Sequence, residues 1–256
     1  MTNQEILRIA MQQSAYDCNC GPSDFAKNEN VVVLSQPHPN ARRYLKLPFS
    51  CDLVSYGNNI VASVQEEYRA LTEEFIRKYA VEHCFETPNL HILNDALLKK
   101  GQKICFMAEY FLPDADVLRE LPCSYELCVL HPVDFAELYV PEWSNALCED
   151  RKHLDVLGIG AYEDGKLIGL AGCSADCEMM WQIGIDVLPD YRRQGIASAL
   201  TSRLAVEILN RGKVPFYCAA WSNIKSVRNA IKSGLRPAWI EVTAKPVEFV
   251  DKMNEK

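Results

Sequence analysis

A loop between a predicted strand and a long predicted helix holds the residues of this 256-residue sequence that are best suited to chemistry. The strand ends at Val187, a Pro-Asp turn follows it, and Gly195 comes just before the helix. The first N–H groups of a helix have no partner within the helix, and the helix dipole favours a negative charge beside them. Gly195 lets a ligand approach the backbone closely, Ala197 leaves the next turn uncrowded, and Arg192 and Arg193 add positive charge. The sequence therefore predicts that this loop binds phosphate groups.

The distribution of charge along the chain also favours a polyanionic ligand at this loop. The whole chain has a formal net charge of −7. From Arg192 to Arg236, however, nine lysines and arginines accompany a single acidic residue, Glu207, so this segment carries +8. Some of these side chains form solvated helix faces, but a basic segment within an acidic protein indicates local binding of a polyanion.

The loop and the residues after it resemble the GNAT acyltransferase superfamily, whose members bind acetyl-coenzyme A. Arg192-x-x-Gly195-x-Ala197 matches the family signature R/Q-x-x-G-x-G/A, and Val187-Leu-Pro189 matches the family's Val-x-Pro before that signature. Further on, Asn223-x-x-Ser226 followed by Gly234-Leu235 is similar to the N-x-x-A/S and G-F with which the family motif ends. These features occur in the family's order, and the resemblance covers residues 124–245. The layout is similar to a two-domain bacterial branch with an extra N-terminal domain.

The resemblance implies a role for each matched position. Backbone N–H groups of the loop and the first helical turn would hold the cofactor's pyrophosphate, with two arginines at the mouth of the site. The residues concerned are Arg192, Arg193, Gln194, Gly195, Ile196, Ala197 and Ser198. The backbone of Ile185 and Val187 would pair with the pantetheine arm, and one of their N–H groups would polarise the thioester carbonyl. Asn223 would hydrogen-bond the pantetheine or the nearby backbone, and Ser226 would line the same tunnel.

The resemblance implies direct attack of a neutral amine on acetyl-coenzyme A, and hence an N-acetyltransferase. This chemistry needs a base or a water chain to take the amine proton, and a proton donor for the departing thiolate. The expected acceptor is a small-molecule or peptide amine. The net charge of −7 favours a cationic amine as the acceptor, and the identity of the acceptor is left open.

The sequence departs from the family at the general acid. Many members carry a tyrosine four residues before the late glycine, and Ala230 stands at that position here. Tyr217 and Ser222 are candidate substitutes, with Tyr217 preferred, and a water or direct release of the thiolate is an equal alternative. The missing tyrosine also motivates an alternative function, a coenzyme-A-binding sensor or interaction protein without catalysis.

Two carboxylates on the strand before the loop are candidates for the base. Glu178 is expected at the start of that strand and Asp186 near its end, with Glu178 preferred. The alternation of side chains along a strand puts both on the face opposite Ile185 and Val187, unless a β-bulge intervenes. The sequence therefore names Glu178 as the candidate base.

Eleven cysteines are scattered along the chain without a C-x-x-C pair, and the closest spacings are Cys18/Cys20 and Cys173/Cys177. We expect reduced thiols, most of them packed as small hydrophobic side chains. A structural zinc site needs four ligands, and His153 is the only histidine within 25 residues of Cys173. No metal site is therefore predicted.

Composition excludes further classes of protein. A net charge of −7 argues against a general nucleic-acid binder. No apolar run approaches the ~18 residues that a membrane span requires. Residues 1–6 contain neither the basic nor the apolar region of a signal peptide, so the expected location is the cytoplasm. The oligomeric state is left open.

The elements that must position these residues form an α/β (α+β) chain with two predicted domains. The N-terminal α/β domain, residues 1–122, has no assigned function, and we expect it to cover or extend the acceptor site. Its strand-helix-strand content faintly resembles a degenerate half of the GNAT fold. Its predicted helices are 4–12, 64–79 and 88–101, and its predicted strands are 31–34, 59–63 and 103–112.

Residues 123–256 form the predicted GNAT domain, a mixed sheet flanked by helices that follows a linker at 114–122. The predicted order is β-α-β-β-β-α-β-α-β. Its strands are 125–130, 156–162, 166–173, 178–187, 213–220 and 238–244, and its helices start at 132 (running towards 147), 194 and 222. Glu163-Asp164-Gly165 between two of the strands is a hairpin signal.

Overall fold

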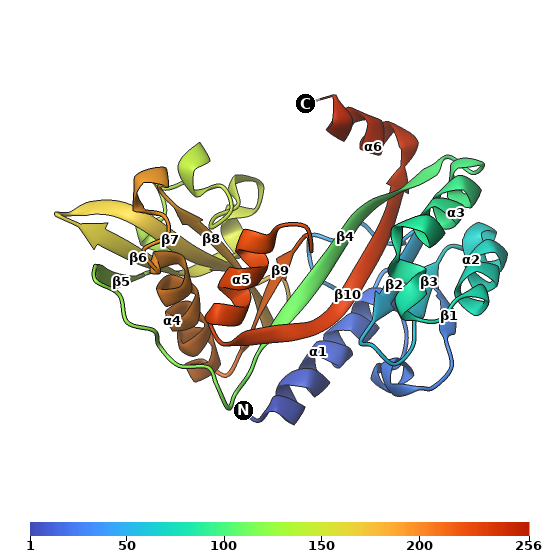
Figure 1. Ribbon diagram of the computed structural model, residues 1–256, viewed down its shortest axis with the longest axis horizontal. Coiled ribbons are helices and arrows are strands. Elements are labelled where there is room, and N and C mark those ends of the chain that lie inside the picture. The colour runs from blue at the N-terminus through green and yellow to red at the C-terminus, as the bar shows by residue number, and fades with distance from the viewer. Residues whose placement is uncertain (256) are drawn as a thin grey trace. The chain divides into compact units, whose positions relative to one another are not determined.

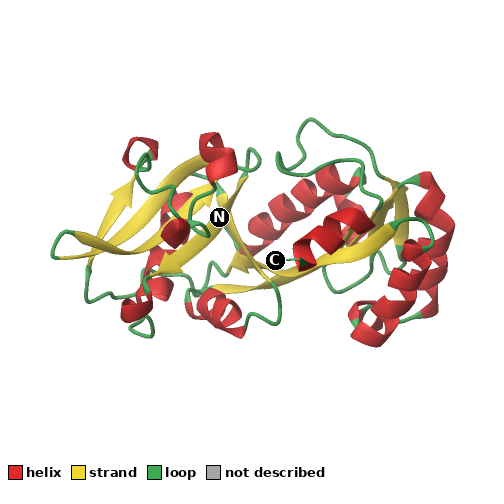
Figure 2. Cartoon of the chain, turned by 90° about the horizontal axis from the view of Figure 1, so that it is seen from above, coloured by secondary structure: helices red, strands yellow, loops and turns green. Residues whose placement is uncertain are grey.

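The computed structural model describes residues 1–255 and has the predicted mixed α/β fold (Figures 1 and 2). The chain forms two compact units. Unit 1 comprises Met1–Ala10 and Tyr110–Pro237, and unit 2 comprises Met11–Glu109 and the chain from Ala238 onward. The boundaries of these units differ from those of the two predicted domains, 1–122 and 123–256. The division into those two domains stays a prediction.

Unit 1 contains a mixed sheet in the strand order β4-β9-β8-β7-β6-β5, to which β4 contributes its last residues (Figure 1). Strands β5 to β8 form an antiparallel meander, whereas β8 and β9 are parallel. The bounds are β4 Gln102–Pro113, β5 Glu126–Leu130, β6 Asp155–Glu163, β7 Lys166–Ser174, β8 Met180–Val187 and β9 Val214–Ala219. The predicted hairpin joins β6 to β7, with Asp164 at φ 48° and Gly165 at φ 78°, the left-handed pair that a tight hairpin turn uses.

Two helices, α4 (Ile196–Asn210) and α5 (Ile224–Lys232), lie beside each other in unit 1 (Figure 1). The apolar side chains of α4 recur at every fourth residue and are buried against β6, β7 and β8, as the sequence predicts. They are Ile196, Leu200, Leu204 and Ile208. The helix that begins at the phosphate loop is therefore anchored to the core along its whole length.

The predicted helix from residue 132 towards 147 is wrong. This segment contains only short 3-10 turns, at Pro132–Asp134 and Pro141–Trp143. Its backbone packs directly on the sheet, because a Cβ added to Gly184 would lie 1.8 Å from the carbonyl oxygen of Asn145. Gly172 makes a similar close approach to Ala146. Contact of backbone with backbone leaves no room for the side chains that surround a regular helix.

Unit 2 has the strand order β1-β3-β2-β10-β4, with β1 parallel to β3 and the pairs β2–β3 and β2–β10 antiparallel. The bounds of its strands are β1 Val31–Leu34, β2 Cys51–Ser55, β3 Val61–Val64 and β10 Leu235–Pro246. The helices are α1 (Asn3–Cys18, which begins in unit 1), α2 (Glu66–Lys78), α3 (Thr87–Leu98) and α6 (Val247–Asn254), and Figure 2 shows the helices in red. Strand β2 and helix α6 are absent from the sequence-based prediction. All five residues of β2 are buried although two are polar, so the strand lacks an apolar pattern.

A cluster of buried polar residues in unit 2 joins β2 and β10 to Asp17 of α1 and to Arg42 of the loop before β2. Arg42 Nε donates to Asp17 Oδ2 at 2.6 Å, and its Nη2 donates to Glu241 Oε2 at 2.9 Å. Asp52 is 1% exposed and accepts a hydrogen bond from Thr243 Oγ1 at 2.6 Å. Burial raises the pKa of Asp52 well above its usual range, and the nearby Glu241 adds to this effect. Asp52 is therefore expected to stay protonated in the folded protein at a pH where an exposed carboxyl is ionised.

Candidate functional site

The loop between β8 and α4 has the backbone geometry that an anion site needs. Arg193 has φ 67° and Gly195 has φ 85°, so the chain passes twice through the left-handed region before the helix begins. The N–H of Ala199 donates to the Gly195 carbonyl, which is the first bond of the helical ladder. The N–H groups of the three preceding residues, Ile196, Ala197 and Ser198, have no carbonyl four residues earlier within the helix. The start of α4 thus has the backbone arrangement on which the prediction depends, and the binding of phosphate there stays a prediction.

Three basic side chains surround this loop. Arg192 and Arg193 are exposed, and Arg192 Nε donates to the carbonyl of Val187 at 2.9 Å. The third is Lys232, the last residue of α5, whose Nζ would lie 3.9 Å from a Cβ placed on Gly195. The loop therefore combines outward N–H groups with positive charge from two separate parts of the chain.

The sequence-based prediction does not include Lys232 among the site residues, although Lys232 contributes to the +8 charge of residues 192–236. Its position depends on the contact between α4 and α5, where Asn229 Nδ2 donates to Thr201 Oγ1 at 3.0 Å. One turn further along α5, Ser233 Oγ lies 3.3 Å from the carbonyl of Ser198. Because of these contacts, the end of α5 lies against the start of α4. No local sequence pattern predicts this neighbourhood.

Tyr125 is a second residue that sequence reasoning missed. Its hydroxyl donates to Gln194 Oε1 at 2.7 Å, and its ring packs edge-on against Tyr191 at 6.0 Å between centroids. Tyr191 in turn donates to Glu163 Oε2 at 2.6 Å. The side chain of Gln194 is therefore held by a residue of the segment before β5.

Strands β8 and β9 pair only at their beginnings. Their register joins Met180 with Val214 and ends at Gln182 with Phe216, so the described pairing does not include residues 183–187. Across the other edge of β8, Leu188 N–H donates to the Ile168 carbonyl of β7, which places the even-numbered backbone groups toward β7. The odd-numbered groups, including those of Ile185, therefore face β9. We call residues 183–187 the open edge of β8.

Ile185 and Val187 lie on this open edge, and their pairing with a pantetheine arm stays a prediction. Their backbone groups face the side of β8 from which β9 diverges, and the Val187 carbonyl already accepts from Arg192. Their side chains pack against the core cluster that contains α4. The open edge and the phosphate loop are consecutive in the chain, so a long ligand bound at the loop can continue along β8.

Tyr217 and Ser226 form a pair beside α4 and α5. The Tyr217 hydroxyl lies 2.6 Å from Ser226 Oγ, and its side chain belongs to the same core cluster as Ala230. Burial raises the pKa of Tyr217, so the phenol stays protonated. Asn223 caps α5, because its Oδ1 accepts from the Ser226 N–H at 3.3 Å. The structure thus brings Tyr217, Ser226 and Asn223 together around the start of α5.

Of the two predicted bases, Asp186 lies near the end of β8 as predicted, whereas Glu178 lies outside the strand. Glu178 is exposed in the loop before β8 rather than in the strand, and it lies nine positions before Val187 in the chain. The strand from Met180 to Val187 alone is about 23 Å long at ~3.3 Å per residue. Asp186 accepts hydrogen bonds from Asn145 N, Asn145 Nδ2 and Ala146 N at 2.8, 2.7 and 3.0 Å. Asp186 therefore fixes the segment that covers the other face of the sheet, and the structure does not bring Glu178 to the phosphate loop.

Within residues 1–255, no group of three or more His, Cys, Asp or Glu side chains is placed to hold a metal ion. No helix in that range is long and apolar enough to cross a membrane. None of the eleven cysteines forms a disulfide there, and five of them are buried.

Comparison with known proteins gives one family match and several structural ones. The model of the family described as GNAT acetyltransferase matches residues 56–237. No curated protein matches the chain. Among solved structures, a GCN5-related N-acetyltransferase from Kribbella flavida is 16% identical, with 60% of this chain and 63% of that chain covered and a TM-score of 0.47.

Two further structures match in the same way. A GNAT-family protein from Novosphingobium aromaticivorans is 18% identical, with 56% of this chain and 66% of that chain covered and a TM-score of 0.45. A GCN5-related N-acetyltransferase-like protein from Streptococcus suis is 22% identical, with 60% and 67% covered and a TM-score of 0.43. The chain thus spans about two thirds of the length of these structures.

Proposed function

The chain belongs to the GNAT acetyltransferase family, and from this premise we propose that it transfers an acetyl group from acetyl-coenzyme A to a primary amine. The observation that carries the proposal is the continuity of the phosphate loop with the open edge of β8. Gly195 starts α4 where β8 has just ended, and the β8–β9 register stops at Gln182 and Phe216. A ligand with a phosphate end and a long peptide-like arm fits such an arrangement.

The loop residues fit a pyrophosphate. The N–H groups of Ile196, Ala197 and Ser198 would donate to its oxygens, and Arg192 and Arg193 would balance its charge. To these predicted residues we add Lys232, whose Nζ lies beside Gly195. The Gln194 side chain is oriented by its hydrogen bond from Tyr125.

The open edge of β8 fits the pantetheine arm. The backbone groups of both Ile185 and Val187 face β9, and the Val187 carbonyl already accepts from Arg192. We propose that the N–H of Ile185 or Val187 polarises the thioester carbonyl and stabilises the negative charge that forms on its oxygen. Acetyl-coenzyme A, when bound, supplies that thioester.

We propose Tyr217 as the group that donates to the departing sulfur in place of the tyrosine missing at Ala230. Its hydroxyl is held by Ser226 at 2.6 Å, and its raised pKa keeps the proton on the phenol until the thiolate leaves. For the amine proton, Glu178 lies at the other end of β8 and Asp186 is occupied by Asn145 and Ala146. We therefore propose that water, rather than either carboxylate, takes that proton.

A thermal-shift experiment with acetyl-coenzyme A tests the proposal. At 100 times its Kd, a ligand stabilises the folded state by ~2.7 kcal/mol, which raises the Tm of a chain of this size by roughly 5–10 °C. Gly195→Asp should abolish the shift, because it adds a negative charge at the loop. Gly212→Asp is the matched control, since Gly212 also has a left-handed φ (72°) but follows the far end of α4.

The outcomes separate the two candidate functions. A shift in the wild type that Gly195→Asp removes, together with release of free thiol in the presence of amines, supports the transferase. A shift without thiol release from any amine supports the coenzyme-A-binding sensor instead. No shift in the wild type refutes the assignment of the cofactor.

A further inference from the structure

One face of α5 is exposed along the whole helix (Figure 1). Its side chains follow the first one by one, four, seven and eight positions, so they lie within about 120° of the helix circumference. They are Ile224, Lys225, Arg228, Ile231 and Lys232, and we call them the outer face of α5. The opposite side of the helix packs into unit 1, where Ala230 is buried in the same core cluster as Tyr217.

Large apolar side chains are exposed on this face and beside it. Ile224 is 51% exposed and Ile231 is 54% exposed, and Trp221, just before the helix, is 57% exposed. A helix face that only meets water normally carries polar residues at such positions. Exposed apolar side chains next to charged ones are instead typical of a surface that binds another protein.

The cations of the outer face are not paired with acids. No ion pair within residues 1–255 includes Lys225, Arg228 or Lys232. Glu207, the single acidic residue of the segment 192–236, pairs with Arg211 at 2.6 Å. The outer face therefore carries three unpaired positive charges in a chain whose net charge is −7.

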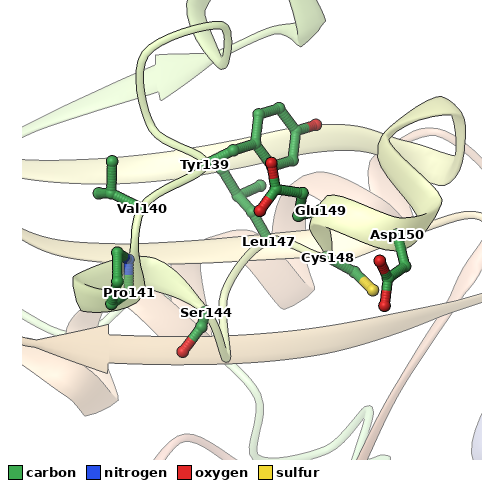
Figure 3. Close-up of a pocket in the computed structure, with 8 residues that line it drawn as sticks. All are labelled: Tyr139, Val140, Pro141, Ser144, Leu147, Cys148, Glu149 and Asp150. Atoms are coloured by element: carbon green, nitrogen blue, oxygen red, sulfur yellow. The ribbon is translucent and has the colours of Figure 1, made fainter.

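The hollow on the 139–150 segment of unit 1 differs in this respect (Figure 3). Lys152 Nζ lies 3.3 Å from Glu149 Oε1 and 4.4 Å from the centre of the Tyr139 ring. In Figure 3 the Glu149 carboxylate lies beside that ring. This carboxylate has a counter-ion within the chain, whereas the cations of the outer face have none among the described residues.

The outer face borders the phosphate loop. Lys232 is its last residue, and the Lys232 Nζ lies 3.9 Å from the position of a Cβ on Gly195. A helix rises ~1.5 Å per residue, which places Arg228 about 6 Å and Lys225 about 10 Å further along the axis. A phosphate held at the loop therefore lies beside Lys232, and the other two cations face whatever that phosphate is attached to.

We propose that the outer face of α5 binds an acidic carrier protein whose phosphopantetheine arm brings an acyl thioester into the site. The inference rests on the proposed function, because it adds a second donor to the same site. Coenzyme A and a carrier protein present the same arm, with a thioester at one end and a phosphate at the other. In a carrier protein that phosphate is joined to a serine, so the protein must lie against the elements around the phosphate loop.

The distribution of charge favours an acidic partner. The three cations of the outer face and the exposed Arg192 and Arg193 of the loop all lie near the phosphate end of the arm. An acidic surface is attracted there and repelled by the remaining, strongly acidic part of the chain, which orients the encounter. Trp221, Ile224 and Ile231 supply apolar contacts. A face of this size suits a transient complex, which the donor leaves after each turnover.

The chemical step is the one proposed for acetyl-coenzyme A. The neutral amine forms a bond to the thioester carbonyl carbon, the C–S bond breaks, and the arm leaves as a thiolate that stays on the carrier protein. The attacking nitrogen loses one proton to water, and the thiolate takes one proton from Tyr217, which regains it from water.

Binding of a purified acyl carrier protein tests the proposal without an acceptor amine. The holo form, which has the phosphopantetheine arm, is titrated by calorimetry into the wild type and into Lys225→Ala/Arg228→Ala. We expect its Kd to rise about tenfold in the double variant at physiological ionic strength, and by more at lower salt. The Kd of coenzyme A should stay within about threefold, because salt screens cations that lie beyond the loop.

Three controls make the result specific. Arg43→Ala/Lys46→Ala removes one exposed arginine and one exposed lysine of unit 2, and it should leave both Kd values unchanged. Ile224→Ser/Ile231→Ser removes the apolar contacts and should weaken only the binding of the carrier protein. The apo carrier protein, whose serine has no arm, should bind about tenfold more weakly than the holo form.

The outcomes separate this inference from the proposed function. If coenzyme A binds and the holo carrier protein does not bind at ~100 μM, the outer face is not its docking surface and the proposed function stands. An equal loss of affinity for coenzyme A in Lys225→Ala/Arg228→Ala would assign the face to the nucleotide, and equal binding of a DNA duplex would assign it to nucleic acid. Carrier-protein binding that this variant weakens, without binding of coenzyme A, supports the docking surface and refutes acetyl-coenzyme A as the donor.

Discussion

Replacing Lys232 with alanine removes one positive charge from the phosphate loop and leaves the loop backbone unchanged. The Nζ atom lies 3.9 Å from the position of a Cβ on Gly195, so a phosphate held by the first N–H groups of α4 would be within about 4–6 Å of the ammonium. Between unit charges at such a distance, the Coulomb energy is ~1 kcal/mol in water and ~3 kcal/mol near a protein surface. Lys232 is exposed, so screening holds the effect at about 1 kcal/mol.

We therefore expect the Kd for coenzyme A to rise about fivefold in Lys232→Ala. The assay is calorimetric titration at low and at physiological ionic strength, with the difference between variant and wild type shrinking as salt is added. Pantetheine, which has no phosphate, serves as a second ligand, and its Kd should not change. Lys225→Ala is the matched control, because Lys225 is an exposed lysine in the first turn of the same helix.

The reasoning is refuted if Lys232→Ala leaves the Kd for coenzyme A unchanged, or if Lys225→Ala weakens binding equally. The second result would mean that only the general positive charge of the segment matters. An equal loss of pantetheine affinity would instead indicate that α5 itself had shifted.

Three further changes have definite expected outcomes. Tyr217→Phe should lower kcat about 100-fold with the coenzyme A Kd within twofold, and a kcat within threefold of wild type would exclude Tyr217 as the acid. Burial raises the pKa of Asp52, so the folded state keeps a proton that the unfolded state loses as the pH rises above about 4. Asp52→Asn should therefore gain Tm over the wild type by more at pH 8 than at pH 4, and a constant difference would contradict this. Gly184→Ala should cost about 3 kcal/mol or more in urea unfolding, since its Cβ would meet the Asn145 carbonyl at 1.8 Å, whereas Gly21→Ala, with 3.4 Å to its nearest neighbour, should be nearly neutral.

Most of the helices and strands could be predicted because their signals are local. The stripe of Ile196, Leu200, Leu204 and Ile208 needs only a period close to 3.6 residues, and the structure buries all four. The Asp164-Gly165 turn needs only two residues that tolerate a positive φ. The predictions that were wrong or missing concern long-range contact: the 132–147 segment packs its backbone on glycines of β7 and β8, and β2 buries polar residues within unit 2.

The candidate site also has features that the local sequence predicts and features that depend on tertiary contacts. The sequence by itself determined the phosphate loop, because its glycine, its helix start and its arginines are consecutive residues whose geometry follows from the chain between Val187 and Ser198. Only the tertiary structure decided that Lys232 lies beside Gly195, since that requires α5 to end against the start of α4.

The tertiary structure likewise decided the surroundings of the two predicted bases. Asp186 is occupied by backbone N–H groups from a segment 40 residues earlier in the chain, and Glu178 lies at the far end of β8. It also brought Lys152 to the Tyr139 ring and the Glu149 carboxylate, a set of contacts that no sequence pattern indicates. The physical reason is that a backbone cradle is built from neighbouring peptide groups, whereas a side chain's partners come from whichever elements the packed core brings against it.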